Sequence, residues 1–304
     1  MYFLKRILFA VPLLVVISML AFVLVRVAPA GPFDRERRPA SPEIERAVRA
    51  KYHLDEPVAT QYLRFIGDLC HGDFGVSLKY RDHTVNDIIR QAVPVSFCLG
   101  ALTFGFCLGV GLPLGYYSAL RHGRWQDFAG SLLAVLMVCI PAFVVAPLLI
   151  VCFAIHWRLL PVALWTSPAH TILPVLALGL FFSGKVARLF REGMTGAMRS
   201  AFITTARAKG LSENAILLKH ALPLAILPVV SYSGPLLADL LTGSFVVETI
   251  FQIPGLGTFL VNGSLNSDYT LVVGLVLFYA VLLIVLNLVI DLAYVLLDPR
   301  VKYE

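Results

Sequence analysis

The chain has 304 residues, of which 58% are hydrophobic and only 14% charged, with a formal net charge of +6. A mean hydropathy of +0.81 excludes an ordinary soluble domain and indicates a membrane protein. The basic residues lie between apolar runs, so the charge indicates membrane topology and not a nucleic-acid-binding patch. The five cysteines show no metal-ligand spacing, and we expect neither a metal site nor a disulfide.

Long uncharged runs follow one another along the chain, and each approaches or exceeds the roughly 20 residues that a membrane-spanning helix needs. Because the runs are continuous and do not alternate, helices are favoured over a β-barrel. The sequence therefore predicts an all-α polytopic membrane protein with six transmembrane helices. The runs cover residues 7–25, 91–120, 128–157, 159–184, 220–238 and 269–290, with 240–247 extending the fifth.

Lys and Arg side chains gather in alternate loops, at Lys5, Arg121, residues 185–219 and Arg300. Positively charged loops stay in the cytoplasm, so both termini are predicted to be cytoplasmic. The expected organisation is then an N-terminal tail and first span (1–27), an external segment (28–91) and a transmembrane core (92–304).

Short sequence motifs predict turns, helix starts and kinks in the external segment and in the spans. Residues 43–52 have helical propensity, His71–Gly75 (HGDFG) reads as a turn, and Thr84–Arg90 is expected to lead into the second span as a helix. Glycines spaced along the second span would let helices approach closely. Pro141 and Pro147 can kink the third span.

Asp239 lies within the fifth span, where a carboxylate is costly and faces a cavity or a partner unless it lies near a solvated end. We take Asp239 as a candidate pathway residue, with pairing at a helix interface as the alternative. After this span, Glu248–Gly257 is expected to form a short external helix that ends at Pro254-Gly255.

Residues 199–223 form a polar, basic island in this apolar chain. Ala201–Lys209 favours a helix, Gly210 is a natural left-handed cap, and Ser212 can cap a second helix. Pro223 can begin the next helix or end this one. Two short helices hinged at a glycine make a ridge that can dock into a partner's groove.

The spacing of this island resembles the loop by which membrane subunits of ATP-driven importers grip their ATPases. Thr204-Thr205-Ala206 takes the place of a triplet that is usually Glu-Ala-Ala, and Gly210 and Leu222-Pro223 keep the family's spacing. The residues that match the docking loop are Thr204, Thr205, Ala206, Lys209, Gly210, Leu211, Leu222 and Pro223.

Further motifs extend the resemblance along nearly the whole chain, which is similar to the membrane permease subunits of peptide-type ATP-binding-cassette importers. The external segment looks closest to the B subunits of oligopeptide permeases, and dipeptide and nickel-chelate permeases share the framework. The motifs are AKYHL (50–54), HGDFG (71–75), TVNDII (84–89), TARAKGL (205–211), PGLG (254–257) and LDPR (297–300).

The resemblance implies a multi-pass protein of the bacterial inner membrane that works in an assembly. A second permease would complete the pathway, two ATPases would dock on the permeases, and an extracytoplasmic peptide-binding protein would deliver the peptide. ATP and Mg²⁺ would belong to the ATPases, since no GxxxxGK[ST] occurs here and no cofactor is expected in this chain.

Two other classes remain to be compared. An intramembrane enzyme is disfavoured, because the serines within the spans lack a paired His or Lys and no HExxH pattern occurs. An ion-coupled secondary carrier would fit six spans and the carboxylate of Asp239, and it would take up solute without an ATPase.

Overall fold

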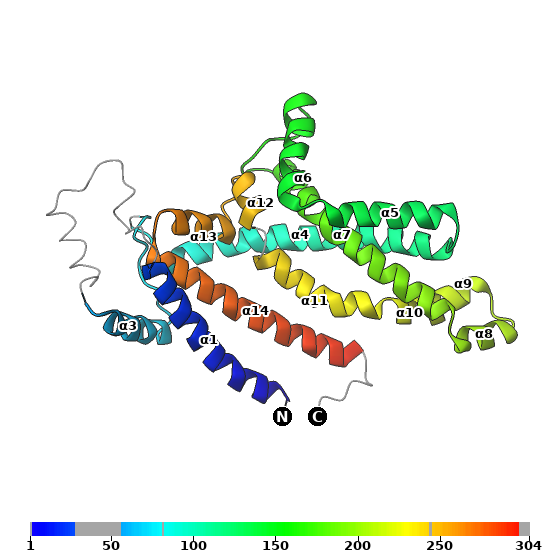
Figure 1. Cartoon of the computed structure of the whole chain (residues 1–304), viewed down its shortest axis with the longest axis horizontal. Coiled ribbons are helices and arrows are strands. Elements are labelled where there is room, and N and C mark those ends of the chain that lie inside the picture. Colours follow the sequence, from blue (N-terminus) through cyan, green and yellow to red (C-terminus); the bar gives the residue numbers. More distant parts are fainter. Residues whose placement is uncertain (1, 28–55, 81, 243–244, 298–304) are drawn as a thin grey trace. The chain divides into compact units, whose positions relative to one another are not determined.

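The computed structural model describes residues 2–27, 56–80, 82–242 and 245–297 (Figure 1). Apart from one isolated bridge between Val76 and Thr84, the regular structure in these residues is helical. The helix expected at 43–52 lies outside the described residues. The helices are α1 (Tyr2–Val27), α3 (Val58–Cys70), α4 (Val85–Leu120), α5 (Trp125–Cys139), α6 (Ala142–Leu149), η1 (Ile150–His156), α7 (Ala169–Met198), α8 (Ala201–Ala208), α9 (Glu213–Ala215), η2 (Ile216–Ala221), α10 (Leu222–Ala225), α11 (Leu227–Thr242), α12 (Phe245–Ile250), α13 (Leu256–Leu265) and α14 (Tyr269–Leu297).

The all-α polytopic class is confirmed, with one span built differently from the expectation. Within the described residues, five helical stretches are long and apolar enough to cross a membrane, and a bent pair makes a sixth. The pair is α5 followed by α6 and η1, which meet at 95°. Ile140 is extended there, with φ −96° and ψ 113°, because a residue before proline is pushed out of the helical region. Pro141 therefore breaks the third span and does not merely kink it.

Two further boundaries differ from the sequence-based expectation. The charge-free run of the fourth span ends at residue 184, but α7 continues to Met198 and carries Lys185, Arg188 and Arg191 on the same helix. The helix expected over Glu248–Gly257 overlaps α12 only at its end, because α12 covers Phe245–Ile250 and stops before Pro254, and the apolar helix α13 after Gly255 was not expected.

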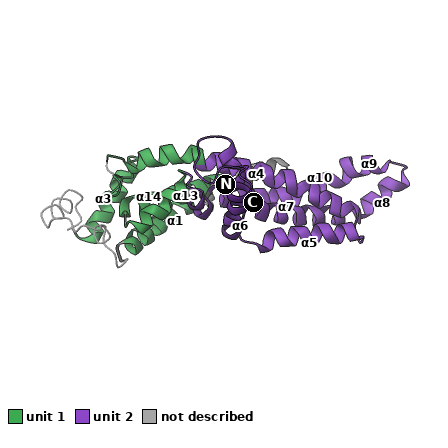
Figure 2. Cartoon of the chain, turned by 90° about the horizontal axis from the view of Figure 1, so that it is seen from above, with its two compact units in different colours: residues 1–95, 254–288, 301–304 green, residues 96–253, 289–300 purple. Residues whose placement is uncertain are grey.

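The chain divides into two compact units, which Figure 2 colours separately. The first comprises residues 1–95, 254–288 and 301–304, and the second comprises residues 96–253 and 289–300. In the first unit, Val85 and Ile88 at the start of α4 pack with Leu271 and Leu275 of α14. A neighbouring cluster joins Phe22 of α1 to α14 and α3, and the Tyr62 hydroxyl lies 2.7 Å from Ser18 Oγ.

The start of α4 is set by the two motifs that the sequence singled out in this region. Thr84 Oγ1 accepts a hydrogen bond from the backbone N–H of Asp87, whose carboxylate accepts one from the N–H of Thr84, as in a capping box. Asn86 donates to the carbonyl of Gly72 at 2.7 Å and accepts from the N–H of Phe74 at 2.9 Å. The turn and the helix were each expected from the sequence, and the hydrogen bonds of Asn86 fix the HGDFG turn onto the first turn of α4.

Asp268 ties the segment after this turn to the start of α14. Its side chain is fully buried, and it accepts hydrogen bonds from the Ser77 hydroxyl, the backbone N–H of Lys79 at 3.0 Å and the N–H of Leu271 at 3.1 Å. The last bond makes Asp268 the N-cap of α14. One carboxylate thus satisfies donors from segments nearly 190 positions apart.

In the second unit, α4 and α7 approach closely through glycines. A Cβ added at Gly115 would lie 2.4 Å from the carbonyl oxygen of Ala187, and one at Gly111 would lie 2.7 Å from Val186 Cβ. Small residues allow this approach between helices in lipid. Gly100 also lies close to a neighbour, since an added Cβ would be 2.7 Å from the Leu241 side chain of α11, whereas Gly105 and Gly109 face open space. The expected close approach therefore holds at three of the five glycines of this span.

We predict that Asp268→Asn destabilises the protein by about 1–3 kcal/mol, because an amide presents a donor where the carboxylate accepts from three donors. The measurement is the thermal unfolding midpoint of the purified protein in detergent. Asp68→Asn on the exposed face of α3 is the matched control and should leave the midpoint unchanged. Equal midpoints for the two variants would contradict the anchoring role of Asp268.

Candidate functional site

The polar island of residues 199–223, which we call the elbow, consists of two short helical limbs that meet at Gly210 (Figure 1). α8 ends in a Schellman motif: the N–H of Gly210 donates to the carbonyl of Arg207 at 2.9 Å, and that of Leu211 donates to Ala206 at 3.3 Å. Gly210 has φ +77°, the left-handed conformation that the sequence predicted for this cap.

The second limb begins as predicted, with Ser212 Oγ accepting a hydrogen bond from the N–H of Ala215 at 3.4 Å. It then widens into the π-helix η2 over Ile216–Ala221 before Pro223 falls in the first turn of α10. Proline lacks an N–H and crowds the carbonyl four residues back, and a wider π turn relieves that conflict.

A charged pair braces the two limbs across the hinge. Arg207 Nε donates to Glu213 Oε1 at 2.7 Å, and Arg207 Nη2 donates to Oε2 at 3.1 Å. The hydrogen bond from Arg207 lowers the pKa of Glu213, and the same bond raises the pKa of Arg207. The brace is therefore fully ionised at neutral pH and is lost only when acid protonates Glu213.

The inner face of the elbow is buried. Ile203 and Ala206 of α8 and Ile216 and Ala221 of η2 belong to one hydrophobic cluster, which includes Met194 and Ala197 at the end of α7. Ile203, Ile216 and Ala221 have no exposed surface. These contacts fix the elbow to α7.

The outer face of the elbow is open to contact. Of the residues that match the docking loop, Ala206 is buried and Leu222 is half-buried, so these two position the elbow. The remaining members of the set are exposed, namely Thr204, Thr205, Lys209, Gly210, Leu211 and Pro223. The structure thus separates the set into an anchoring part and a surface part.

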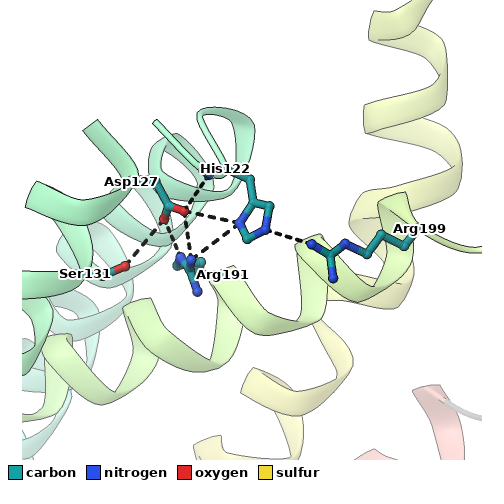
Figure 3. A network of polar contacts seen from close by, with 6 residues as sticks. His122, Asp127, Ser131, Arg191 and Arg199 are labelled. Atoms are coloured by element: carbon teal, nitrogen blue, oxygen red, sulfur yellow. Dashed lines mark hydrogen bonds and ion pairs between the residues drawn. The ribbon is translucent and has the colours of Figure 1, made fainter. Parts of the chain in front are cut away.

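A network of polar side chains joins α7 to the start of α5, close to the residue where the elbow begins (Figure 3). Asp127, only 5% exposed, receives the guanidinium of Arg191 on both carboxylate oxygens, with Arg191 Nη2 at 2.8 Å from Oδ2. It also accepts from the N–H of Gly123 at 3.0 Å and from Ser131 Oγ at 3.4 Å. A bidentate Arg–carboxylate pair fixes orientation as well as distance.

His122 continues this network to Arg199, the residue that follows α7. Its Nδ1 lies 3.2 Å from Asp127 Oδ2, and its Nε2 lies 2.8 Å from Arg199 Nη2 (Figure 3). The tautomer with its proton on Nδ1 donates to Asp127 and accepts from Arg199, and the 3.4 Å approach of Arg191 Nη2 to Nδ1 is then not a hydrogen bond. Arg199 is the first residue of the elbow, two positions before α8 begins at Ala201, so side chains join the α4–α5 loop to the point where the elbow begins.

Sequence reasoning did not find this network. The third uncharged run begins at residue 128 and leaves Asp127 just outside it, and Arg191 belongs by sequence to the same basic stretch as Lys185 and Arg188. A carboxylate at the start of an apolar helix was the available signal. The candidate pathway residue Asp239 lies on an exposed side of α11.

Comparison with known proteins places the chain in a family. Residues 111–303 match the "Binding-protein-dependent transport system inner membrane component" family, and residues 1–100 match the corresponding N-terminal family. The oligopeptide transport system permease protein OppB of Escherichia coli is 43% identical over 306 residues, covering 99% of each chain. OppB of Haemophilus influenzae is 42% identical over 301 residues, covering 98% of each chain. The dipeptide transport system permease protein DppB of Bacillus subtilis is 42% identical over 301 residues, covering 99% of this chain and 97% of that protein.

Solved structures share the fold. The inward-facing MetNI methionine ABC transporter aligns with a TM-score of 0.60 at 15% identity, covering 69% of this chain and 96% of that chain. An amino acid ABC transporter with histidines aligns with a TM-score of 0.54 at 18% identity, covering 71% and 95%. The family matches over residues 1–100 and 111–303 and the near full-length relatives at 42–43% identity show that the chain belongs to the family of inner-membrane components of binding-protein-dependent transport systems.

Proposed function

We propose that this chain is a permease subunit of an ATP-driven peptide importer and that the elbow is where an ATPase docks. With a second permease it would form the pathway for oligopeptides across the inner membrane. The OppB relatives, similar over nearly their whole length, support the peptide substrate. The basic loops support an orientation with both termini and the elbow in the cytoplasm.

The energy for transport must reach this chain through contacts. Its sequence has no GxxxxGK[ST] phosphate-binding loop, so ATP and Mg²⁺ would be bound by two partner ATPases. An extracytoplasmic peptide-binding protein would deliver the substrate to the external side, where residues 28–91 are expected to lie. This division of labour makes the chain a transporter subunit and not an enzyme.

The observation that carries the proposal is the two-sided construction of the elbow. Its inner face is locked to α7 by side chains with no exposed surface, such as Ile203 and Ile216, while Thr204, Lys209 and Leu211 stand free on the outside. A surface that is rigidly backed and unoccupied on its outer side can transmit a push from a partner into the spanning helices.

The polar network is a second set of contacts through which a displacement of the elbow can reach the spanning helices. A displacement of the elbow acts on Arg199, which contacts His122 in the α4–α5 loop, and on Arg191, which holds Asp127 in α5. Because α5 is the first half of the bent third span, movement at the elbow would reach a helix that already has a break at Ile140.

Dipeptides are the second candidate substrate, and the observation that favours them is the 42% identity to DppB of Bacillus subtilis. Nickel chelates would require the same subunit role with a different binding protein. The ion-coupled carrier raised by Asp239 is disfavoured by membership of a binding-protein-dependent family.

The test of the function is uptake of a labelled tripeptide into proteoliposomes that contain the two permeases and the ATPases, with binding protein added. Uptake should require ATP, the binding protein and this chain. Uphill uptake by this chain alone, driven by a proton or sodium gradient, would overturn the proposal.

We predict that Gly210→Pro abolishes ATP-dependent uptake while membrane insertion persists. Proline fixes φ near −65° where the hinge has +77°, and it removes the N–H that donates to Arg207. The measurements are peptide uptake and co-purification of the ATPases.

Gly210→Ala and Gly210→Asn are the matched controls. An added Cβ meets no atom within 4 Å, so alanine costs only the backbone term of about 1–2 kcal/mol, and asparagine costs less because it tolerates this conformation. Uptake should fall in the order Gly, Asn, Ala, Pro. Normal uptake with Gly210→Pro would count against the hinge.

We predict that Arg191→Gln lowers peptide uptake and weakens the contact between α5 and α7. The free energy of unfolding should fall by about 1–3 kcal/mol, because Asp127 is left buried without its ionic partner. The double change Asp127→Asn with Arg191→Gln should be milder than Arg191→Gln alone. The measurements are ATP-dependent peptide uptake and the thermal unfolding midpoint of the two single variants, Arg191→Gln and Asp127→Asn, and of the double variant. A double variant as defective as the two single effects added together would show that the pair is not coupled.

A further inference from the structure

A pocket of about 270 Å³ in the second unit lies apart from the elbow and the polar network. Lys185, Arg188, Leu189 and Glu192 of α7 line it, together with Tyr232 of α11. The α7 residues recur three or four positions apart, so they share one side of that helix. Core residues such as Met194 lie on the opposite side of α7, while the apolar parts of the pocket, Leu189 and Tyr232, pack against the same core cluster.

The polar groups of this pocket have unused binding capacity. The Tyr232 hydroxyl is enclosed by protein atoms and, among the described residues, has no hydrogen-bond partner. The Lys185 ammonium lies 4.5 Å from the centroid of the Phe181 ring, a cation–π contact that leaves N–H donors available. Within the described parts of the chain, neither Lys185 nor Arg188 forms an ion pair.

A charged side chain on a membrane-spanning helix is energetically costly, so such a residue is by default a candidate for contact with a ligand or ion in the pathway. Two cations and the single carboxylate of Glu192 leave the pocket with a net charge of about +1. That charge, with one enclosed hydroxyl donor, suits a group that carries one negative charge and accepts hydrogen bonds on two oxygens. A carboxylate meets both conditions.

Asp239 extends this arrangement along α11. It lies seven positions after Tyr232, and therefore on the same side of the helix, roughly 10 Å further along the axis. Three residues of extended chain span about the same length, roughly 10 Å. A cationic pocket and an exposed carboxylate at this separation match the two charged ends of a short peptide.

We propose that this pocket binds the terminal carboxylate of a peptide in transit, with Lys185 and Arg188 supplying the charge and Tyr232 a hydrogen bond. Asp239 faces the peptide's ammonium end. The inference rests on the proposed function, because it assigns a binding site within the pathway of a peptide importer. It names a substrate-selecting element in the permease itself, in addition to any selection by the binding protein.

The experiment compares two substrates that differ only in this group, trialanine with a free carboxylate and trialanine amide. Uptake of each is measured in proteoliposomes that contain the full complex, with saturating binding protein. The readout is the ratio of acid to amide uptake in each variant divided by the ratio in the wild type. Because the binding protein is the same throughout, its own preference cancels.

We expect the Lys185→Gln/Arg188→Gln double variant to lower this ratio about tenfold, since a charge-assisted contact is lost for the acid alone. Tyr232→Phe, which removes only the hydroxyl, should lower it by about two- to threefold. Arg121→Gln, which removes an exposed charge in the α4–α5 loop, is the matched control and should leave the ratio unchanged.

An unchanged ratio in the double variant would overturn the pocket assignment. An equal loss of uptake of both peptides, which also leaves the ratio unchanged, is the result expected if the pocket holds a lipid headgroup. Failure of the second permease to co-purify would indicate that these residues form a subunit contact, and it would overturn the assignment as well. Absence of ATP-dependent uptake of both peptides by the wild-type complex would instead reject the proposed function, so the two failures are distinguishable.

Discussion

The packing of the elbow's inner face against the end of α7 is the contact on which the proposed coupling depends. Side chains such as Ile203 and Ile216 have no exposed surface, and each would lose packing if the elbow turned away from Met194. Close-packed interiors transmit displacement because they have no free volume to absorb it. A partner that moves the outer face therefore moves α7, and the Schellman cap at Gly210 keeps the two limbs at a fixed angle during that movement.

The polar network and the apolar cluster complement each other. The apolar cluster resists separation of the elbow from α7 but is indifferent to direction, since hydrophobic burial is non-directional. The bidentate pair between Arg191 and Asp127 and the contact of His122 with Arg199 are directional and fix how α7 is rotated against α5. Both are needed if a push at the elbow is to reach the broken third span in a defined direction.

Local chemistry determined most of what could be predicted from the sequence. The spans follow from uncharged length, and the caps at Gly210, Ser212 and Thr84 follow from residues that interact within one turn. What could not be predicted depends on distant partners: Arg191 and Asp127 are 64 positions apart, and Ser77 and Asp268 are 191 apart. The run of basic residues after position 184 suggested the end of a span, because composition alone does not show whether a helix continues after charges appear.

Because α7 continues past position 184, basic residues lie on two sides of the same helix. The two sides differ in whether the positive charge has an ionic partner. On one side the charge of Arg191 is neutralised by Asp127, and this ion pair stabilises the packing of α7 against α5. On the other side Lys185 and Arg188 line a pocket in which Tyr232 keeps a hydroxyl without a partner among the described residues. A charge kept near a membrane without an internal partner costs free energy in the resting protein. An anion in the pocket would offset that cost, so we place the transported carboxylate on the side of α7 where the charges have no ionic partner among the described residues.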